Sequence, residues 1–148
     1  MKEGGEQVTE RPSIALIAHD SKKADMICLV KAHQEELAVF GLVATRGMGQ
    51  LVQGRTSLRV TVMHSGPYGG DQQIGAMVAG GELDALIFLR DPLTAQPHEP
   101  DVTALLRVCD VHDVPVATNL ATAEAVLHTL FEHPAAMRGQ HVATPVPA

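Results

Sequence analysis

The segment HSGPYGGDQQIG, residues 64–75, combines four glycines with one carboxylate, Asp71. Glycines between an apolar run and a helical pattern let the backbone approach an anion closely, most often a phosphate. A carboxylate beside a bound phosphate repels it, so Asp71 needs a separate role in such a loop. An acidic residue in the first turn of a helix is also favoured by the helix dipole. Taken alone, Asp71 therefore stays ambiguous.

Side chains able to bind or catalyse also follow the other apolar runs of the chain. In chain order, the candidates are His19, Asp20, Lys22, Lys23, Thr45, Arg46, Gly47, Ser65, Gly66, Asp71, Arg90, Asp91, His98 and Asp101. Ionisable groups stand at the ends of four of the five runs. Stability alone gives a buried strand little reason to end in an ionisable group. We therefore expect a site where these ends meet.

The elements that must position these residues alternate regularly along the chain. Buried strands are predicted at 13–19, 40–45, 58–64, 85–89 and 114–119. Helical periods separate them: Val102, Leu105, Leu106 and Cys109; Ile27, Val30 and Leu37; and Ala125, Val126 and Leu130. Strands that are apolar on both faces and separated by helices predict an α/β fold, a single three-layer α/β/α domain with a five-stranded, mainly parallel sheet. In such folds ligands bind outside the carboxyl ends of the strands.

Each candidate also has a purely structural interpretation. Asp20 and Asp101 precede helical patterns, where Asp is more often an N-cap than a catalyst. Asp91 stands before a proline and could simply open a turn. His98 alone is most simply a surface-loop histidine. Solvated side chains are the simplest interpretation of Lys22, Lys23, His33, His112, His128, His133 and His141.

A metal site built from these residues is not favoured. His64, Asp91, His98 and Asp101 could supply ligands, but no spacing such as His-x-x-x-His supports such a site. We therefore predict no metal.

Composition limits the partners of the chain. Its 17 acidic and 11 basic residues give a net charge of −6, which makes nucleic acid and anionic membranes poor partners. A small anion can still bind where donors cluster. The chain has 148 residues, a length typical of one domain.

The domain is expected to span residues 13–133, between a flexible N-terminal segment at 1–12 and a loosely ordered, proline-rich tail at 134–148. The first residues lack the apolar stretch of a secretory signal, and no apolar run approaches transmembrane length, so we expect a cytoplasmic protein. Cys28 and Cys109 fall within helical patterns and are predicted to be reduced core residues.

Three segments carry a resemblance to a known family. IALIAHDSKK, HSGPYGGDQQIGAMVAGGELDALIFLRDPLTAQPHEPDVTALLRV and VPVATNLATAE resemble methylglyoxal synthases over most of residues 13–127. The long middle block is far more specific than a single glycine pattern. The resemblance implies an enzyme that converts dihydroxyacetone phosphate to methylglyoxal and inorganic phosphate. It also implies a homohexamer that needs no metal or organic cofactor, with phosphate as product and possible inhibitor.

By resemblance, Asp71 matches the catalytic base. His98 and Asp101 match its partners in handling the enediol oxygens and protons, and His19 matches a second histidine near those oxygens. The positions that hold the phosphate are matched by Lys23, Thr45, Ser65 and Gly66. Acidic residues that line the site are matched by Asp20 and Asp91. In this interpretation the early part of the glycine loop holds phosphate, while Asp71 faces the carbon.

The chain departs from the family at residues 45–49. Where the family commonly has Thr-Gly-Thr-Thr-Gly, this chain has Thr-Arg-Gly-Met-Gly, so hydroxyls are missing at 47 and 48. Arg46 could replace them by gripping phosphate, with Gly47 letting backbone N–H groups come closer. Alternatively, Arg46 points to solvent or to a neighbouring subunit. The departure also leaves open a weak or inactive relative that binds a phosphorylated effector or serves in assembly.

Overall fold

The computed structural model describes residues 12–133. The predicted flexible segment at 1–12, apart from Pro12, and the predicted tail at 134–148 lie outside this range. Among the described residues, no helix is long and apolar enough to cross a membrane.

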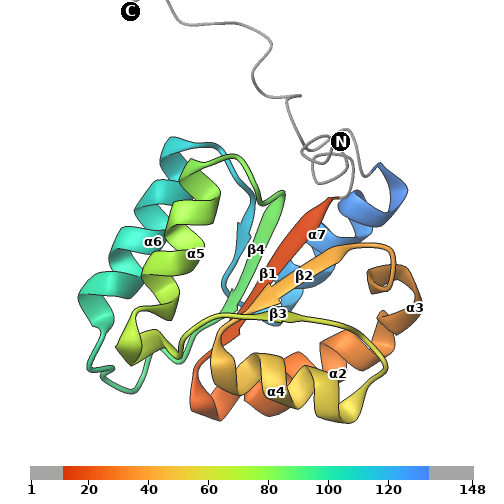
Figure 1. The fold of residues 1–148 in the computed structure, drawn as a ribbon, viewed down its shortest axis with the longest axis horizontal. Coiled ribbons are helices and arrows are strands. Elements are labelled where there is room, and N and C mark those ends of the chain that lie inside the picture. The colour runs from red at the N-terminus through yellow and green to blue at the C-terminus, as the bar shows by residue number, and fades with distance from the viewer. Residues whose placement is uncertain (1–11, 134–148) are drawn as a thin grey trace, which may run out of the picture.

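A five-stranded parallel sheet forms the centre of the fold (Figure 1). Its strands are β1 (Ser13–Ala18), β2 (Gly41–Ala44), β3 (Thr61–Val62), β4 (Ala85–Leu89) and β5 (Val116–Ala117), in the order β3-β2-β1-β4-β5. In the register of β1, Ile14 lies opposite Leu42 on one side and Ala85 on the other. The chain adds strands on one side of β1 and then on the other, so the strand order reverses between β1 and β4. Such a switch point is where open α/β sheets bind ligands.

Helices cover both faces of the sheet, which gives the predicted three layers. They are the short 3-10 helices η1 (Asp20–Lys22) and η2 (Gly66–Tyr68), and the α-helices α2 (Lys23–Ala32), α3 (Gln34–Leu37), α4 (Arg46–Arg55), α5 (Gly70–Ala79), α6 (Glu99–Val111) and α7 (Leu120–Glu132). In Figure 1, α5 and α6 lie side by side over one face, and α2 and α4 lie on the other side.

Alternating side chains of β1 divide the core between the two faces. Ile14 and Leu16 join the cluster built with α2, α4 and α7, whereas Ala15 and Ile17 join the cluster built with α5 and α6. Successive strand residues point to opposite faces, so a strand apolar at every position is covered on both. The prediction of a parallel sheet between two helical layers is confirmed.

Three details differ from the sequence predictions. The edge strand β3 has only two residues, both exposed, although 58–64 is predicted to be buried throughout. Helix α7 buries Ala123, Leu127 and Leu130, so the predicted apolar face is shifted in phase. Cys109 is buried as expected, but Cys28 is exposed and is not a core residue.

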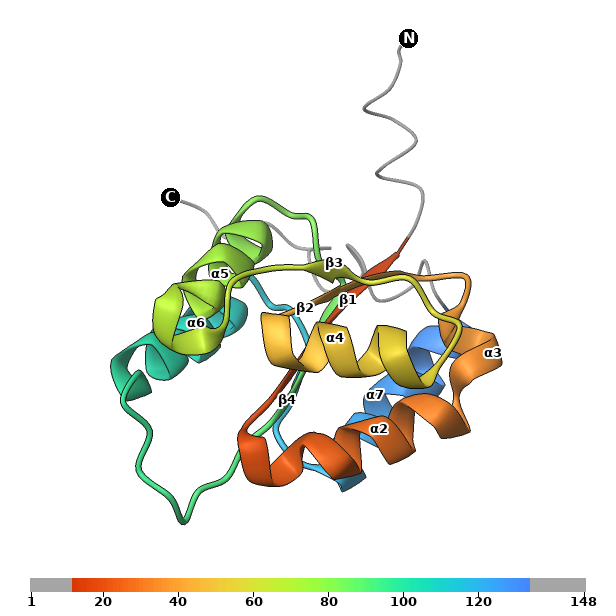
Figure 2. The same cartoon turned by 60° about the horizontal axis from the view of Figure 1, so that its bottom comes forward.

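The connection from β4 to α6 extends away from the sheet at the carboxyl ends of the strands (Figure 2). It carries Pro92, Leu93 and Thr94, all exposed, before it turns back into α6. Two bonds fix its ends: Arg90 donates from Nη2 to Glu99 Oε2 at 3.1 Å, and the backbone N–H of Arg90 bonds to the carbonyl of Thr118. The loop therefore returns to the sheet with His98 at a fixed place.

Candidate active site

A cavity of about 230 Å³ opens at the carboxyl ends of the strands. Its walls come from residues that follow β1, β2, β3 and β4, as expected for a switch-point site. The predicted site residues that line it are His19, Asp20, Lys23, Thr45, Gly47, Ser65, Gly66, Asp71 and His98. The sequence prediction that the strand ends meet is confirmed for these residues.

Asp71 lies in the first turn of α5 with its side chain completely buried. Glycines make this placement possible: Gly69 has a φ of 100°, and Gly70 packs so closely on the carbonyl of His64 that no Cβ could fit. Neither carboxylate oxygen has a hydrogen-bond partner among residues 12–133. A buried carboxylate without a partner is rare in folded proteins, since the charge stays unsolvated.

The surroundings of Asp71 raise the pKa of its carboxyl group. Burial is the main cause, His98 acts in the opposite direction, and the negative charge of Asp101 adds to the rise. The helix dipole at the start of α5 favours the ionised form. Burial outweighs the attraction of His98, and a raised pKa makes the carboxylate a better proton acceptor.

His98 faces Asp71 across the cavity. Its Nε2 lies 3.6 Å from Asp71 Oδ2, which is too long for a hydrogen bond and short enough for an ion pair when the ring is protonated. The His98 side chain is only 11% exposed, and its Nδ1 has no partner in the described part of the chain. The ring packs against Gly66, where a Cβ would lie 2.6 Å from Nε2. Gly66 thus leaves the space that the imidazole occupies.

His19 presents one ring nitrogen to the protein and leaves the other unpaired. Its Nδ1 accepts a hydrogen bond from the backbone N–H of Asp91 at 2.9 Å. A neutral ring that accepts at Nδ1 carries its proton on Nε2, and that buried atom has no partner within residues 12–133. Burial, followed by the neighbouring His98, lowers the pKa of His19. His19 therefore lines the cavity as a neutral ring with an unused N–H donor.

Asp101 and Asp91 do not line the cavity. Gln72 donates from Nε2 to Asp101 Oδ1 at 3.0 Å, which ties α5 to α6 near Asp71. Asp91 accepts from the Ser21 hydroxyl at 2.8 Å and from the backbone N–H of Leu93 at 3.0 Å. The second bond is a local turn interaction, so the turn interpretation of Asp91 is confirmed.

The N-cap interpretations of Asp20 and Asp101 are wrong. The residues at the cap positions of η1 and α6 are His19 and His98, and neither helix start has a side-chain cap hydrogen bond. Asp20 instead pairs with Lys23, Nζ to Oδ1 at 2.9 Å, and this bond lowers the pKa of its carboxyl group.

Hydrogen-bond donors make up another part of the cavity lining, the phosphate wall. Lys23, Thr45, Gly47, Ser65 and Gly66 all line it. Thr45 precedes α4, whose first-turn N–H groups have no partner within the helix and suit an anion. A Cβ on Gly47 would lie 2.6 Å from Lys23 Nζ, so this glycine lets the ammonium group approach the start of α4. The arrangement can bind a phosphate.

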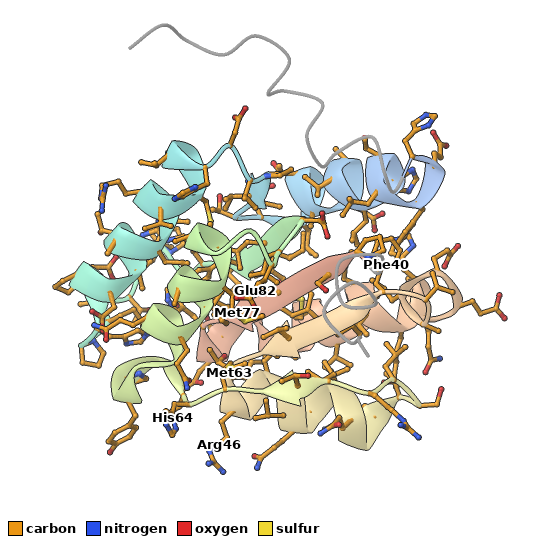
Figure 3. All side chains as sticks on the ribbon, turned by 45° about the horizontal axis from the view of Figure 1, so that its top comes forward. Phe40, Arg46, Met63, His64, Met77 and Glu82 are labelled. Carbon is orange, nitrogen blue, oxygen red and sulfur yellow. The ribbon has the colours of Figure 1, made fainter. Side chains whose placement is uncertain are left out.

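Arg46 does not line this cavity. Its side chain is exposed and points outward from the molecule (Figure 3). Met48, which also belongs to α4, is buried in the core. Within one chain, Arg46 therefore does not replace the missing hydroxyls, and the alternative in which it points to solvent fits the structure.

Several residues of the cavity were not predicted. Gln96 and Pro97 line it just before His98, and Pro67 lines it after Gly66. Helix α4 was also missed, since its three glycines hide any helical period. Only proximity to predicted site residues could have indicated them, because a loop glutamine or proline carries no pattern of its own.

Comparison with known proteins identifies the family. The model of the MGS-like domain matches residues 25–118. The chain belongs to the MGS-like domain family. It is 59% identical over 121 residues to the methylglyoxal synthase of Moorella thermoacetica, covering 82% of this chain and 94% of that protein. It is 60% identical over 117 residues to that of Carboxydothermus hydrogenoformans, covering 79% and 97%.

A solved structure shows the same fold. The crystal structure of methylglyoxal synthase from Elizabethkingia anophelis NUHP1 superposes with a TM-score of 0.77 at 36% identity. The match covers 93% of this chain and 94% of that one.

Proposed function

We propose that this protein is a methylglyoxal synthase, a carbon–oxygen lyase that converts dihydroxyacetone phosphate to methylglyoxal and inorganic phosphate. One observation carries the proposal: a buried carboxylate without a hydrogen-bond partner lies in one cavity with two histidines and a set of phosphate donors. The chain also covers nearly the full length of relatives that bear this name.

Asp71 acts first, as the base. The substrate carbonyl acidifies the C–H bonds of the neighbouring hydroxymethyl carbon, and the carboxylate removes one proton to give an enediolate. His19 donates its Nε2–H to the developing oxyanion, and His98 interacts with the neighbouring oxygen or its proton. Fixed donors in a dry site lower the barrier because they need no reorganisation. Asp101 supports this step by raising the pKa of Asp71.

The phosphate wall selects the second step. The enediolate could be reprotonated, which would only isomerise the substrate. Loss of phosphate requires the C–O bond to stand perpendicular to the enediolate plane, so that its electrons overlap. Lys23 and the α4 N-terminus hold the phosphate in that orientation and stabilise the departing anion. The remaining enol takes up a proton to become methylglyoxal.

A purely binding or assembly role fits this site poorly. A module that only binds phosphate does not need Asp71, whose buried charge costs stability and repels the ligand. The missing hydroxyls at 47 and 48 affect the phosphate wall alone and leave the carboxylate and histidines in place.

The remaining parts of the proposal concern the cell and the assembly. The protein works in the cytoplasm, where its substrate is made, as a homo-oligomer with the hexamer as the expected form. It uses no organic cofactor or metal in the reaction, and inorganic phosphate inhibits it as a product. Light scattering coupled to size-exclusion chromatography measures the subunit number directly.

A coupled assay tests the activity. Purified protein is mixed with dihydroxyacetone phosphate, and methylglyoxal and phosphate are measured together. Equal amounts of both products support the proposal, while phosphate binding without either product supports the effector alternative. The variant His98→Gln keeps one donor, so it should lose part of the turnover and leave phosphate inhibition nearly unchanged. Equal losses of both would mean that the loop before α6 had collapsed.

A further inference from the structure

A second cluster of titratable side chains lies away from the cavity, between α2, α3 and α7. It consists of His33, Glu124 and His128, whose potential ligand atoms all lie within 4.8 Å of one another. Within residues 12–133, no other group of three His, Cys, Asp or Glu side chains meets this condition. The sequence interpretation of His33 as solvated is wrong, because its side chain is only 15% exposed.

The cluster is held by both helix geometry and packing. Glu124 and His128 are four residues apart on α7 and therefore share one face of the helix. His33 stands between α2 and α3, where it breaks the helical run, and its ring contacts that of Phe131 at 5.5 Å between centroids. This contact holds the imidazole ring of His33 against α7.

Glu124 lies between the two rings. Its Oε1 is 2.8 Å from His33 Nε2 and 3.4 Å from His128 Nε2, and the two rings stand nearly perpendicular at 5.9 Å between centroids. Two imidazole nitrogens and one carboxylate oxygen thus converge from two segments that are 91 residues apart in sequence.

We propose that His33, Glu124 and His128 form a binding site for a divalent transition metal ion, with Zn²⁺ as the best fit. Two imidazoles and one carboxylate are a common ligand set for zinc sites that keep a fourth position open to water. Imidazole ligands also disfavour Mg²⁺ and Ca²⁺, which prefer oxygen.

The three ligand atoms already lie within 4.8 Å of one another, and their two distances to Glu124 can be compared with those of a zinc site. Ligand atoms around tetrahedral Zn²⁺ lie about 3.3 Å apart, for bonds of about 2.0–2.1 Å. The His128–Glu124 distance of 3.4 Å already matches, and the hydrogen bond from His33 at 2.8 Å must open slightly. Glu124 and His128 are 46% and 65% exposed, so their side chains can turn without disturbing the core. The same exposure leaves room for a water on the fourth position.

Such an ion would join α7 to the end of α2 and stabilise the layer that these helices form. Helix α2 begins at Lys23 in the cavity and ends just before His33, and its ten residues span about 15 Å. The proposed ion therefore takes no part in the reaction, and the inference goes beyond the proposed function.

Titration calorimetry with Zn²⁺ on the full, untagged chain tests the proposal. We expect one equivalent to bind, and a rise in Tm of about 5 °C or more when free Zn²⁺ is about 100 times the Kd. His128→Ala, Glu124→Gln and His33→Gln should each weaken binding by at least about tenfold. Two controls should bind as the wild type does: His112→Ala, an exposed histidine after α6, and Asp71→Asn, which alters the cavity.

Three outcomes would overturn the proposal. One is no binding at about 1 mM Zn²⁺. Another is unchanged affinity in His128→Ala and Glu124→Gln, which replace half-exposed side chains and should fold normally. The third is loss of binding in Asp71→Asn with retention in the cluster variants, which would place the ion in the cavity.

Discussion

Asp71 joins two properties that rarely occur together in a protein, complete burial and the absence of any hydrogen bond among the described residues. A side chain selected only for stability would gain a partner or become apolar. The unpaired ring nitrogens of His19 and His98 stand beside the same cavity. These three residues are suited to a ligand that supplies the missing partners.

The pH dependence of turnover should reflect the buried carboxyl group. Asp71 must be ionised to accept a proton, and its pKa is raised above the ordinary 3.8. We therefore expect kcat/KM to fall as the pH decreases through a midpoint above 3.8, which a pH profile of kcat/KM measures.

The variant Asp101→Asn is the matched control. It removes a negative charge that raises the pKa of Asp71, and its side-chain oxygen can still accept from Gln72. The acid limb should move to lower pH. An acid limb that stays in place would mean that another group controls it.

Residue types at the strand ends could be predicted from the sequence, whereas their partners could not. His19 was assigned from its place after the first apolar run, but its tautomer depends on the backbone N–H of Asp91, which lies 72 residues away. The outward direction of Arg46 was also undetermined, since neighbouring positions at a helix start face different ways.

Short elements set the spacing inside the site, and Gly66 at the start of η2 is the clearest case. An added methyl group would lie 2.6 Å from His98 Nε2 and 3.0 Å from Cδ2. Gly66→Ala should displace the imidazole and lower kcat at least tenfold, because about 1 Å of misplacement can cost about a hundredfold. Steady-state kinetics, with circular dichroism to confirm folding, provide the measurement.

Gly54→Ala serves as the control for that substitution. Gly54 is exposed on α4, and an added Cβ meets nothing within 4 Å. It should leave kcat unchanged and stabilise the helix by about 0.5–1 kcal/mol. Equal activity in both alanine variants would show that the position of His98 is not critical.

The start of α4 offers a separate test through Arg46. Because this side chain points away from the cavity, Arg46→Ala should leave the KM for dihydroxyacetone phosphate within about twofold of the wild type, an effect typical of surface changes. A tenfold or larger rise in KM would instead indicate that Arg46 reaches a phosphate, for example in a neighbouring subunit.

Long apolar elements were predictable and short ones were not. The prediction of 85–89 matches β4, because five consecutive buried residues are typical of a strand that is covered on both faces. Helix α4 was missed because glycines at 47, 49 and 54 remove the helical pattern, although Gly47 and Gly49 allow the close approach of Lys23 and β3. The functional constraint there overrides the local propensity.

At the scale of the whole molecule, the raised pKa of Asp71 is a cost to stability. The folded state holds the Asp71 proton more tightly than the unfolded chain does, because burial disfavours the charge. Folding stability therefore decreases as the pH rises through the folded-state pKa and is fully retained only below the unfolded value near 3.8. An active site that opposes stability in this way is a common compromise.

The neutral variant Asp71→Asn should escape this cost. Its Tm should exceed that of the wild type near neutral pH, and the difference should shrink as the pH falls toward 3.8. Thermal unfolding across pH measures both curves. A variant that is less stable than the wild type near neutral pH would contradict the assignment of Asp71 as a buried charge that destabilises the folded state.

The turnover of Asp71→Asn tests the central claim most directly. Methylglyoxal formation from dihydroxyacetone phosphate is measured for the variant and the wild type, together with inhibition by inorganic phosphate. Loss of a general base predicts a fall in kcat of about 10²–10⁴-fold or more, with phosphate inhibition retained because the Lys23 and α4 wall is unchanged. Near-normal turnover in the variant would contradict the account, since Asp71 could then not be the base.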